Sequence, residues 1–200
     1  MSGQNKVSGV VLAGGQAQRM RRRDKGLVLF RQRTLISYAL ETMAPLVDEL
    51  LISANRNRQT YARFGYRVIG DAGETFEGPL AGILAAMRVA QYPVLLVMPC
   101  DSPMVKPAHL QRLLSDLAAD ADLTVAFDGE RMHPVFLALK THLQASLHEY
   151  LRCGERKLQF WLRQHKAVEV DFSDVPEIFA NINTLAELAA LEQAAVNPVF

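Results

Sequence analysis

Cysteine is scarce in this chain of 200 residues, which contains only Cys100 and Cys153. Two cysteines cannot form the framework of several disulfides that stabilises small secreted domains, and their spacing does not match the CxxC pairs of zinc sites. Long hydrophobic runs are missing too, because no apolar stretch approaches the roughly 18 residues that a membrane-spanning helix needs. We therefore expect a cytoplasmic protein with reduced thiols and no membrane partner.

An excess of charge of either sign is also missing. Lys and Arg number 22 against 21 Asp and Glu, so the formal net charge is +1. This balance excludes a broadly basic nucleic-acid-binding protein. One short basic run spans residues 19–23, but it has no interleaved aromatic residues on which bases could stack, so we expect no nucleic-acid partner.

Several well-known catalytic motifs are absent. The chain has no GxSxG elbow of serine hydrolases, no GxGxxG dinucleotide fingerprint and no GxxxxGK[ST] phosphate-binding loop. The five histidines are scattered, and we expect each of them to be structural or exposed: His109, His133, His142, His148 and His165.

Hydrophobic periodicity alternates between the patterns of strands and helices. Apolar runs predict strands at 7–13, 49–54, 66–69, 94–98, 123–127 and 134–139. Helical spacing and capping signals predict helices at 34–47, 79–90, from 106–107 onward and at about 184–195. This order predicts an α/β fold with three layers, a mostly parallel sheet with helices on both faces. The turn signal Asp128-Gly129 adds a local antiparallel excursion. We find no repeat or linker, so residues 1–200 are expected to form a single domain.

Ligands of open parallel sheets bind beyond the carboxyl ends of the strands. There the first strand delivers Gly14 and Gly15, which let backbone N–H groups approach a phosphate, and five cations follow between positions 19 and 25. The next strands deliver Ser53 with Asn55, then Asp71, then Asp101. This set suits a nucleotide with its phosphates and Mg²⁺, which needs only one or two protein carboxylates. Taken alone, the glycine pair could be a tight turn, and each aspartate could be a helix cap or an ion-pair partner.

Together these segments resemble a known family over roughly residues 8–190. The chain is similar to the molybdenum cofactor guanylyltransferases, which have a Rossmann-like nucleotidyltransferase core. The segments that carry the resemblance are Leu12-Ala13-Gly14-Gly15, Arg19-Met20, Asp24-Lys25-Gly26, Ser53-Ala54-Asn55-Arg56, Gly78-Pro79-Leu80-Ala81-Gly82, Pro99-Cys100-Asp101-Ser102-Pro103 and Asn181-Ile182-Asn183-Thr184.

The resemblance implies transfer of GMP from GTP to the terminal phosphate of a molybdenum-bearing pterin, with release of pyrophosphate. It implies that Lys25 and Arg19 contact the phosphates and that Asp101 ligates Mg²⁺, the expected cofactor. It further implies nucleotide- or pterin-binding roles for Leu12, Ala13, Gly14, Gly15, Ser53, Asn55, Asp71, Asn181 and Asn183. The substrates would be GTP and molybdopterin, and the implied partners are a companion GTP-binding protein, cofactor chaperones and the recipient molybdoenzymes.

The chain departs from the family pattern at two places. Arg21-Arg22-Arg23 follows Arg19-Met20 where the family usually has glycine, and Ser53 stands where relatives often carry asparagine. Two other interpretations stay open. One is a cytidylyltransferase or another nucleotidyltransferase on the same fold, although cytidine-using relatives tend to have LAAG in place of LAGG. The other is a non-catalytic nucleotide-binding regulator.

Overall fold

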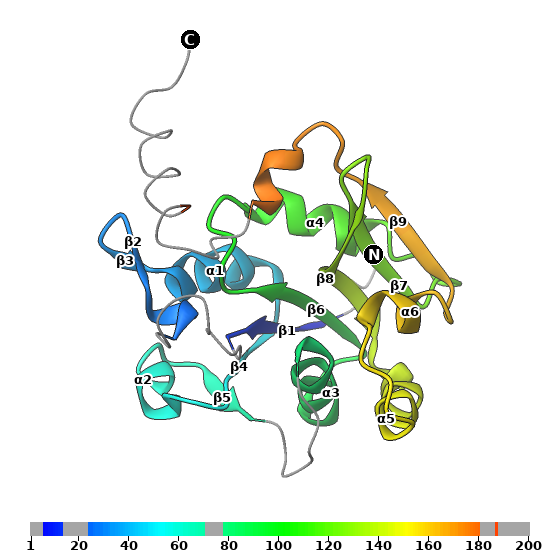
Figure 1. The fold of residues 1–200 in the computed structure, drawn as a ribbon, viewed down its shortest axis with the longest axis horizontal. Coiled ribbons are helices and arrows are strands. Elements are labelled where there is room, and N and C mark those ends of the chain that lie inside the picture. The colour runs from blue at the N-terminus through cyan, green and yellow to red at the C-terminus, as the bar shows by residue number, and fades with distance from the viewer. Residues whose placement is uncertain (1–5, 14–23, 71–77, 181–186, 188–200) are drawn as a thin grey trace.

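A seven-stranded sheet forms the centre of the molecule (Figure 1). The computed structural model describes residues 6–13, 24–70, 78–180 and 187. The strand order is β5-β4-β1-β6-β8-β7-β9, and β8 alone runs antiparallel to its neighbours β6 and β7. The predicted α/β class, the mostly parallel sheet and the antiparallel excursion are therefore confirmed. The strands are β1 (Val7–Leu12), β4 (Glu49–Ser53), β5 (Arg67–Ile69), β6 (Val94–Pro99), β7 (Leu123–Phe127), β8 (Met132–Lys140) and β9 (Ala167–Asp171).

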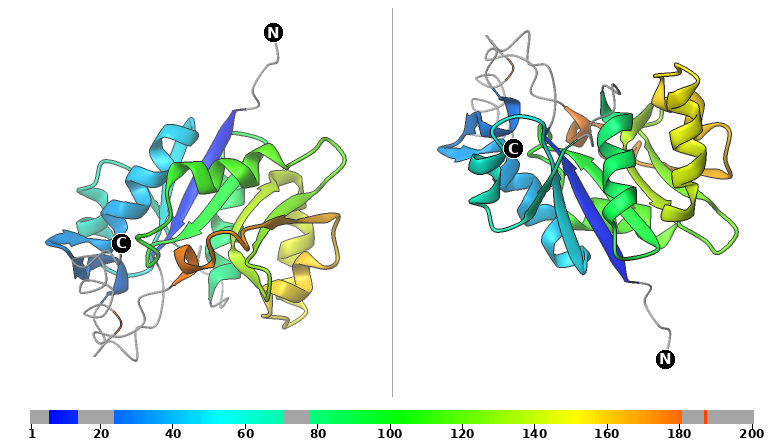
Figure 2. Two further views of the ribbon diagram at one scale, coloured as in Figure 1. Left: turned by 90° about the horizontal axis from the view of Figure 1, so that it is seen from above. Right: turned by 90° about the horizontal axis from the view of Figure 1, so that it is seen from below.

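Helices cover both faces of this sheet, as the two opposite views of Figure 2 show. One face carries α1 and α4, and the other carries α3, α5 and α6, while α2 lies beside β5 at the edge of the sheet. Their bounds are α1 (Leu35–Met43), α2 (Arg58–Ala62), α3 (Pro79–Val89), α4 (Pro107–Ser115), α5 (Gln144–Arg152) and α6 (Leu158–Leu162). Among the described residues, no helix has the length and apolar character required to cross a membrane.

The sheet separates two hydrophobic cores. Val10 and Val11 are neighbours on β1 and both are fully buried, but Val11 belongs to the core under α1 and α4 while Val10 belongs to the core under α3, α5 and α6. Successive side chains of a strand point to opposite faces, so a central strand with helices on both sides must be apolar at consecutive positions. This is the physical reason why β1 and β6 could be predicted from uninterrupted apolar runs.

A proline lies at the start of α3 and another follows the end of α1, on opposite faces of the sheet. Helix α3 begins at Pro79, after Gly78 with φ +85° as its N-cap, and the first helical position is where proline fits best. Helix α1 ends at Met43, and a short 3-10 turn (Ala44–Leu46) containing a proline follows it. The predicted helix 34–47 was therefore too long, because that proline cannot donate to the helical hydrogen-bond ladder.

Several short or half-exposed elements were not predicted. They are the hairpin of β2 (Leu29–Phe30) and β3 (Arg33–Thr34), helices α2 and α5, and strand β9. The predicted helix at 184–195 lies outside the described residues except for Glu187.

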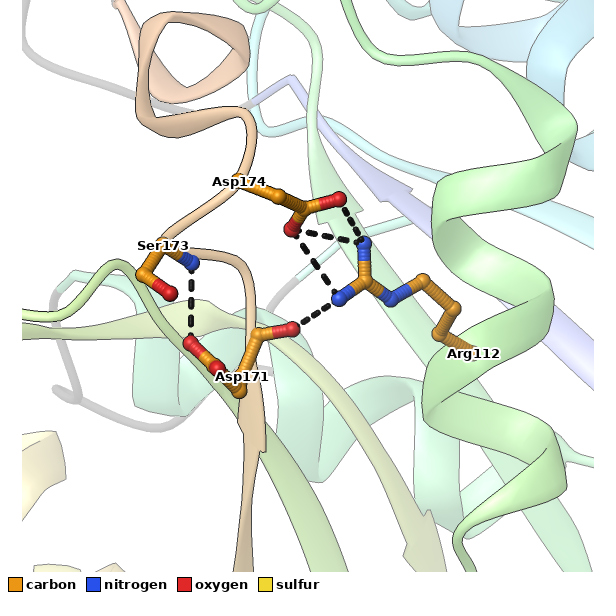
Figure 3. A network of polar contacts seen from close by, with 4 residues as sticks. All are labelled: Arg112, Asp171, Ser173 and Asp174. Carbon is orange, nitrogen blue, oxygen red and sulfur yellow. Dashed lines mark hydrogen bonds and ion pairs between the residues drawn. The ribbon is translucent and has the colours of Figure 1, made fainter.

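Arg112 of α4 ties the chain segment that follows β9 to the helical layer (Figure 3). Its guanidinium donates to both carboxylate oxygens of Asp174, at 3.1 and 3.2 Å, and to the backbone oxygen of Asp171. The same group lies 4.2 Å from the ring centroid of Phe172. Arg112 thus holds the end of β9 through several hydrogen bonds from one planar guanidinium and through a cation–π contact. A lysine has no planar guanidinium and could not make this set of hydrogen bonds.

Candidate active site

The ends of β1, β4 and β6 lie side by side at the carboxyl edge of the sheet. Backbone pairing continues past the ends of the strands. The Ala13 amide donates to the backbone oxygen of Ser53 at 2.9 Å, and the Cys100 amide donates to the backbone oxygen of Leu12 at 3.1 Å. The first, second and fourth predicted strands therefore deliver their terminal residues to one place. Leu12, Ala13, Ser53 and Asp101 of the predicted set are brought together there.

Ser53 and Asn55 lie at this edge in different surroundings. Ser53 is 5% exposed, and its hydroxyl faces Gly82 of α3, where an added Cβ would lie only 2.7 Å from the Ser53 Oγ. Asn55 is exposed and lies next to Gly70, beyond the end of β5, with its Oδ1 3.2 Å from the position of a Cβ on that glycine. Asn55 therefore faces the solvent side of the edge, whereas the Ser53 side chain packs against α3.

Asp101 forms an ion pair with Lys25 directly beyond the end of β6. The Lys25 Nζ donates to the Asp101 Oδ2. Lys25 opens a single 3-10 turn (Lys25–Leu27), so a loop that follows β1 in the chain meets the end of β6 here. The pairing joins two motifs that are 76 residues apart in sequence.

The second oxygen of Asp101 suits a cation. Asp101 is 8% exposed, and its Oδ1 is buried without a hydrogen-bond partner within the described part of the chain. A buried carboxylate oxygen without a partner is costly, and a bound cation would remove that cost. The described residues contain no group of three or more His, Cys, Asp or Glu placed to hold a metal.

Asp24, just before Lys25, is held by two side chains that sequence reasoning did not single out. Tyr61 of α2 donates its hydroxyl hydrogen to the Asp24 Oδ1, and the Asn57 Nδ2 donates to the Asp24 Oδ2 at 3.0 Å. No motif signals these two residues, because Tyr61 lies in a helix of five residues without repeated apolar spacing and Asn57 is the N-cap of that helix.

A second polar cluster lies beyond the end of β7. The Asp128 carboxylate accepts hydrogen bonds from the backbone N–H groups of Arg131 and Glu130 at 2.8 and 2.9 Å, and its Oδ2 lies 2.6 Å from the His133 Nε2. These bonds hold the pKa of Asp128 well below its usual range. The His133 ring stacks on Phe179, with centroids 4.1 Å apart. His133 is thus a buried histidine that attaches the β7–β8 turn to the segment ending at 180.

Cys100 is buried between the ends of β1 and β6. Burial raises the pKa of its thiol far above the usual value, so the group stays a protonated thiol and packs as a small apolar residue. His109 has a local structural role, because its Nδ1 accepts the Lys106 amide hydrogen at 3.1 Å at the start of α4.

The remaining residues of the predicted site lie outside the described residues. They are Gly14, Gly15, Arg19, Asp71, Asn181 and Asn183, together with the arginine cluster 21–23.

Comparison with known proteins gives consistent matches over nearly the whole chain. The model of the MobA-like NTP transferase domain family matches residues 9–169. A molybdenum cofactor guanylyltransferase of Shewanella piezotolerans is 43% identical over 192 residues, which cover 96% of this chain and 94% of the relative. One of Shewanella sediminis is 45% identical over 189 residues, covering 94% and 96%.

A solved structure shares the fold. Molybdopterin-guanine dinucleotide biosynthesis protein A of Archaeoglobus fulgidus superposes with a TM-score of 0.76 at 23% identity, covering 94% of this chain and 98% of that one. The family match over residues 9–169 and the near-full-length relatives at 43% and 45% identity lead to one conclusion. The chain belongs to the MobA-like NTP transferase family, together with the molybdenum cofactor guanylyltransferases.

Proposed function

We propose that this protein transfers GMP from GTP to the terminal phosphate of molybdenum-bearing molybdopterin. An acceptor phosphate oxygen forms a bond to the α-phosphorus of GTP, the bond from that phosphorus to the β-phosphate oxygen breaks, and pyrophosphate leaves. The observation that carries the proposal is the Asp101 carboxylate, which has one oxygen on Lys25 and one buried oxygen that lacks a hydrogen-bond partner among the described residues. The names of the relatives at more than 40% identity support the choice of substrates.

A divalent cation is expected for this class of reaction, and the Asp101 site fits Mg²⁺. Asp101 would hold the ion together with phosphate oxygens of the nucleotide. Bound there, Mg²⁺ would neutralise negative charge on the phosphates during the transfer.

Lys25 supplies a positive charge beside Asp101. In the structure its ammonium pairs with Asp101, and this position beside the proposed metal ligand supports a role in binding the phosphates. Phosphoryl-type transfer depends on positioning and on charge stabilisation more than on a covalent nucleophile, and a fixed ammonium provides both. Arg19 is proposed to add a second cation to the phosphates.

The other residues of the predicted set would bind the two substrates. The backbone of Leu12, Ala13, Gly14 and Gly15 would hold guanine and ribose, with Ser53, Asn55 and Asp71 beside the nucleoside, and Asn181 and Asn183 on the pterin side. The companion GTP-binding protein, the cofactor chaperones, the molybdoenzymes and the cytoplasmic location stay predictions.

The test compares the wild-type protein with Asp101→Asn in an assay of pyrophosphate release with GTP, Mg²⁺ and molybdopterin. We expect the substitution to lower turnover roughly a hundredfold or more, because a lost charge-stabilising group harms the transition state most. GTP affinity should change much less. The matched control is Asp120→Asn, an exposed aspartate between α4 and β7, before the amino end of β7.

Other outcomes would select the other interpretations. Equal pyrophosphate release with CTP and GTP would identify a less selective nucleotidyltransferase. Tight GTP binding without pyrophosphate, whatever the acceptor, would identify a non-catalytic binding protein. Unchanged turnover of Asp101→Asn would contradict the proposed role of Asp101.

A further inference from the structure

The carboxylate of Asp24 has both of its oxygens engaged by one structural unit. Asn57 and Tyr61 come from the start and the body of α2, and each donates to a different oxygen of Asp24. Asn57 is the N-cap of α2 with φ 51°, and its backbone oxygen accepts the Tyr61 amide at 3.0 Å. The two donors are therefore fixed relative to each other by the first turn of the helix.

Tyr61 also packs directly on the residue that follows Lys25. A Cβ added to Gly26 would lie 2.5 Å from the Tyr61 hydroxyl oxygen, so only glycine allows this approach. The hydroxyl end of the phenol therefore donates to Asp24 and also lies against Gly26. Lys25 lies between these two contact points in the chain.

The Tyr61 hydroxyl is a buried hydrogen-bond donor. The side chain is fully buried in the core under α1. Burial in the first place, and then the hydrogen bond to Asp24, raises the pKa of its hydroxyl far above the usual value. The group therefore stays protonated throughout the physiological pH range, as the hydrogen bond to Asp24 requires.

Without the Tyr61 hydroxyl, the Asp24 Oδ1 would lose this donor, while Asn57 would still hold the Oδ2. The Oδ1 could then attract the Lys25 ammonium, which is next in the chain, and compete with Asp101 for it. We propose that Tyr61 is a positioning residue, which holds Asp24 and Gly26 so that the Lys25 side chain reaches Asp101 and the nucleotide phosphates. The catalytic part of this proposal rests on the proposed function, whereas the placement of Lys25 does not.

The test uses three tyrosines of this chain that each donate one hydroxyl hydrogen bond. Tyr61→Phe removes the bond to Asp24, and the matched controls are Tyr38→Phe, which removes a 2.9 Å bond to the Phe30 oxygen, and Tyr150→Phe, which removes a 3.0 Å bond to the Lys157 oxygen. The first readout needs no nucleotide. It is the rate at which acetic anhydride acetylates Lys25, whose side chain is 21% exposed in the ion pair, measured by mass spectrometry. We expect severalfold faster labelling in Tyr61→Phe and wild-type rates in both controls.

The second readout is kinetic and includes a double-mutant cycle with Lys25→Ala. Tyr61→Phe should lower kcat/KM for GTP roughly tenfold, since a hydrogen bond to a charged group is lost, and part of the loss should appear in kcat, because Lys25 stabilises charge during the transfer. In the Lys25→Ala background the same change should have almost no further effect, because Tyr61 acts through Lys25.

Three results would overturn the proposal. They are Lys25 labelling in Tyr61→Phe equal to that in the controls, a kcat/KM equal to theirs, or fully additive losses with Lys25→Ala. If the wild-type protein releases no pyrophosphate, the proposed function fails, but the labelling comparison still decides the placement of Lys25. Should Tyr61→Phe not fold, Asn57→Gly removes the other donor with a residue that accepts φ 51°, and the same labelling increase is expected.

Discussion

Gly82 shows how a single residue can bring a helix onto the site. Helix α3 approaches the ends of β4 and β1 so closely that a Cβ on Gly82 would lie 2.7 Å from the Ser53 Oγ and 3.0 Å from the Leu12 Cδ2. Because both residues lie at the edge that holds Asp101, the missing methyl group at Gly82 decides how near α3 lies to the site.

Gly82→Ala is therefore expected to destabilise the protein through this contact. Overpacking typically costs about 1–3 kcal/mol, offset by the roughly 1 kcal/mol that alanine gains over glycine in a helix. The helix gain is the same in a Ser53→Ala background, but there the Oγ is gone and the Ser53 Cβ is 3.5 Å away. Urea unfolding should show a smaller cost of Gly82→Ala in that background. Equal costs in both backgrounds would disprove the contact.

Sequence motifs pointed to some of these residues but not to their pairings. Lys25 and Asp101 were predicted as site residues from their motifs, and the structure adds that they form an ion pair. Tyr61 has no signal in the sequence, because its role depends on a contact with Asp24, which is 37 positions away. A motif fixes residue types at short spacing, whereas such a contact exists only after the chain has folded.

The β7–β8 hairpin is the element that departs most from a parallel sheet. Its turn is closed by Asp128, which accepts backbone hydrogen bonds from Glu130 and Arg131 and pairs with His133. Through the stacking of His133 on Phe179, the turn also fixes the segment that leads toward Asn181. The hairpin therefore connects the sheet to the segment that precedes Asn181 and Asn183, for which we propose a role on the pterin side.

We expect the stability of this element to depend on acidic pH. The pKa of Asp128 in the folded state lies below its unfolded value of about 3.9, so its contribution to stability is present above that value and is lost as the pH falls toward the folded pKa. Asp128→Asn should accordingly lower the Tm at pH 7, and its difference from the wild-type protein should shrink below about pH 4. Thermal unfolding of both proteins between pH 2 and 7 measures this, and Asp120→Asn is the control. A difference that is independent of pH would show that Asp128 does not act through its charge.

Element prediction succeeded where hydrophobic burial alone decides the structure. The central strands β1 and β6 are buried on both faces, so their sequences are continuous apolar runs. Strand β9 lies at the edge of the sheet with three of its five residues exposed, and α2 has five residues. Such elements form because neighbours hold them, so their local sequences carry little periodic signal.

At the scale of the whole molecule, the site joins segments from both halves of the chain to one sheet. Ligand binding at the ends of β1, β4 and β6 should therefore stabilise the entire fold by linkage. Trp161, the one tryptophan, lies on α6 and is fully buried in the core under α3, α5 and α6, so its fluorescence reports global unfolding at a distance from the site.

GTP with Mg²⁺ at about a hundred times its Kd should add about 2.7 kcal/mol to the free energy of unfolding. For a protein of this size that corresponds to roughly 5–10 °C in the Tm, followed by Trp161 fluorescence. The part of the shift that EDTA removes should be missing in Asp101→Asn. A shift that EDTA does not affect would mean that no divalent cation takes part in binding.

The sequence by itself determined the α/β class and the central strands, and it predicted the edge of the sheet at which the candidate site lies. It could do so because apolar runs report burial on both faces, and because the carboxyl ends of parallel strands always meet at one edge. Only the tertiary structure decided which side chains meet there: Lys25 with Asp101, Tyr61 with Asp24, and Ser53 with Gly82. These contacts join residues 29–76 positions apart, and their geometry depends on how helices pack on the folded sheet, which no local pattern encodes.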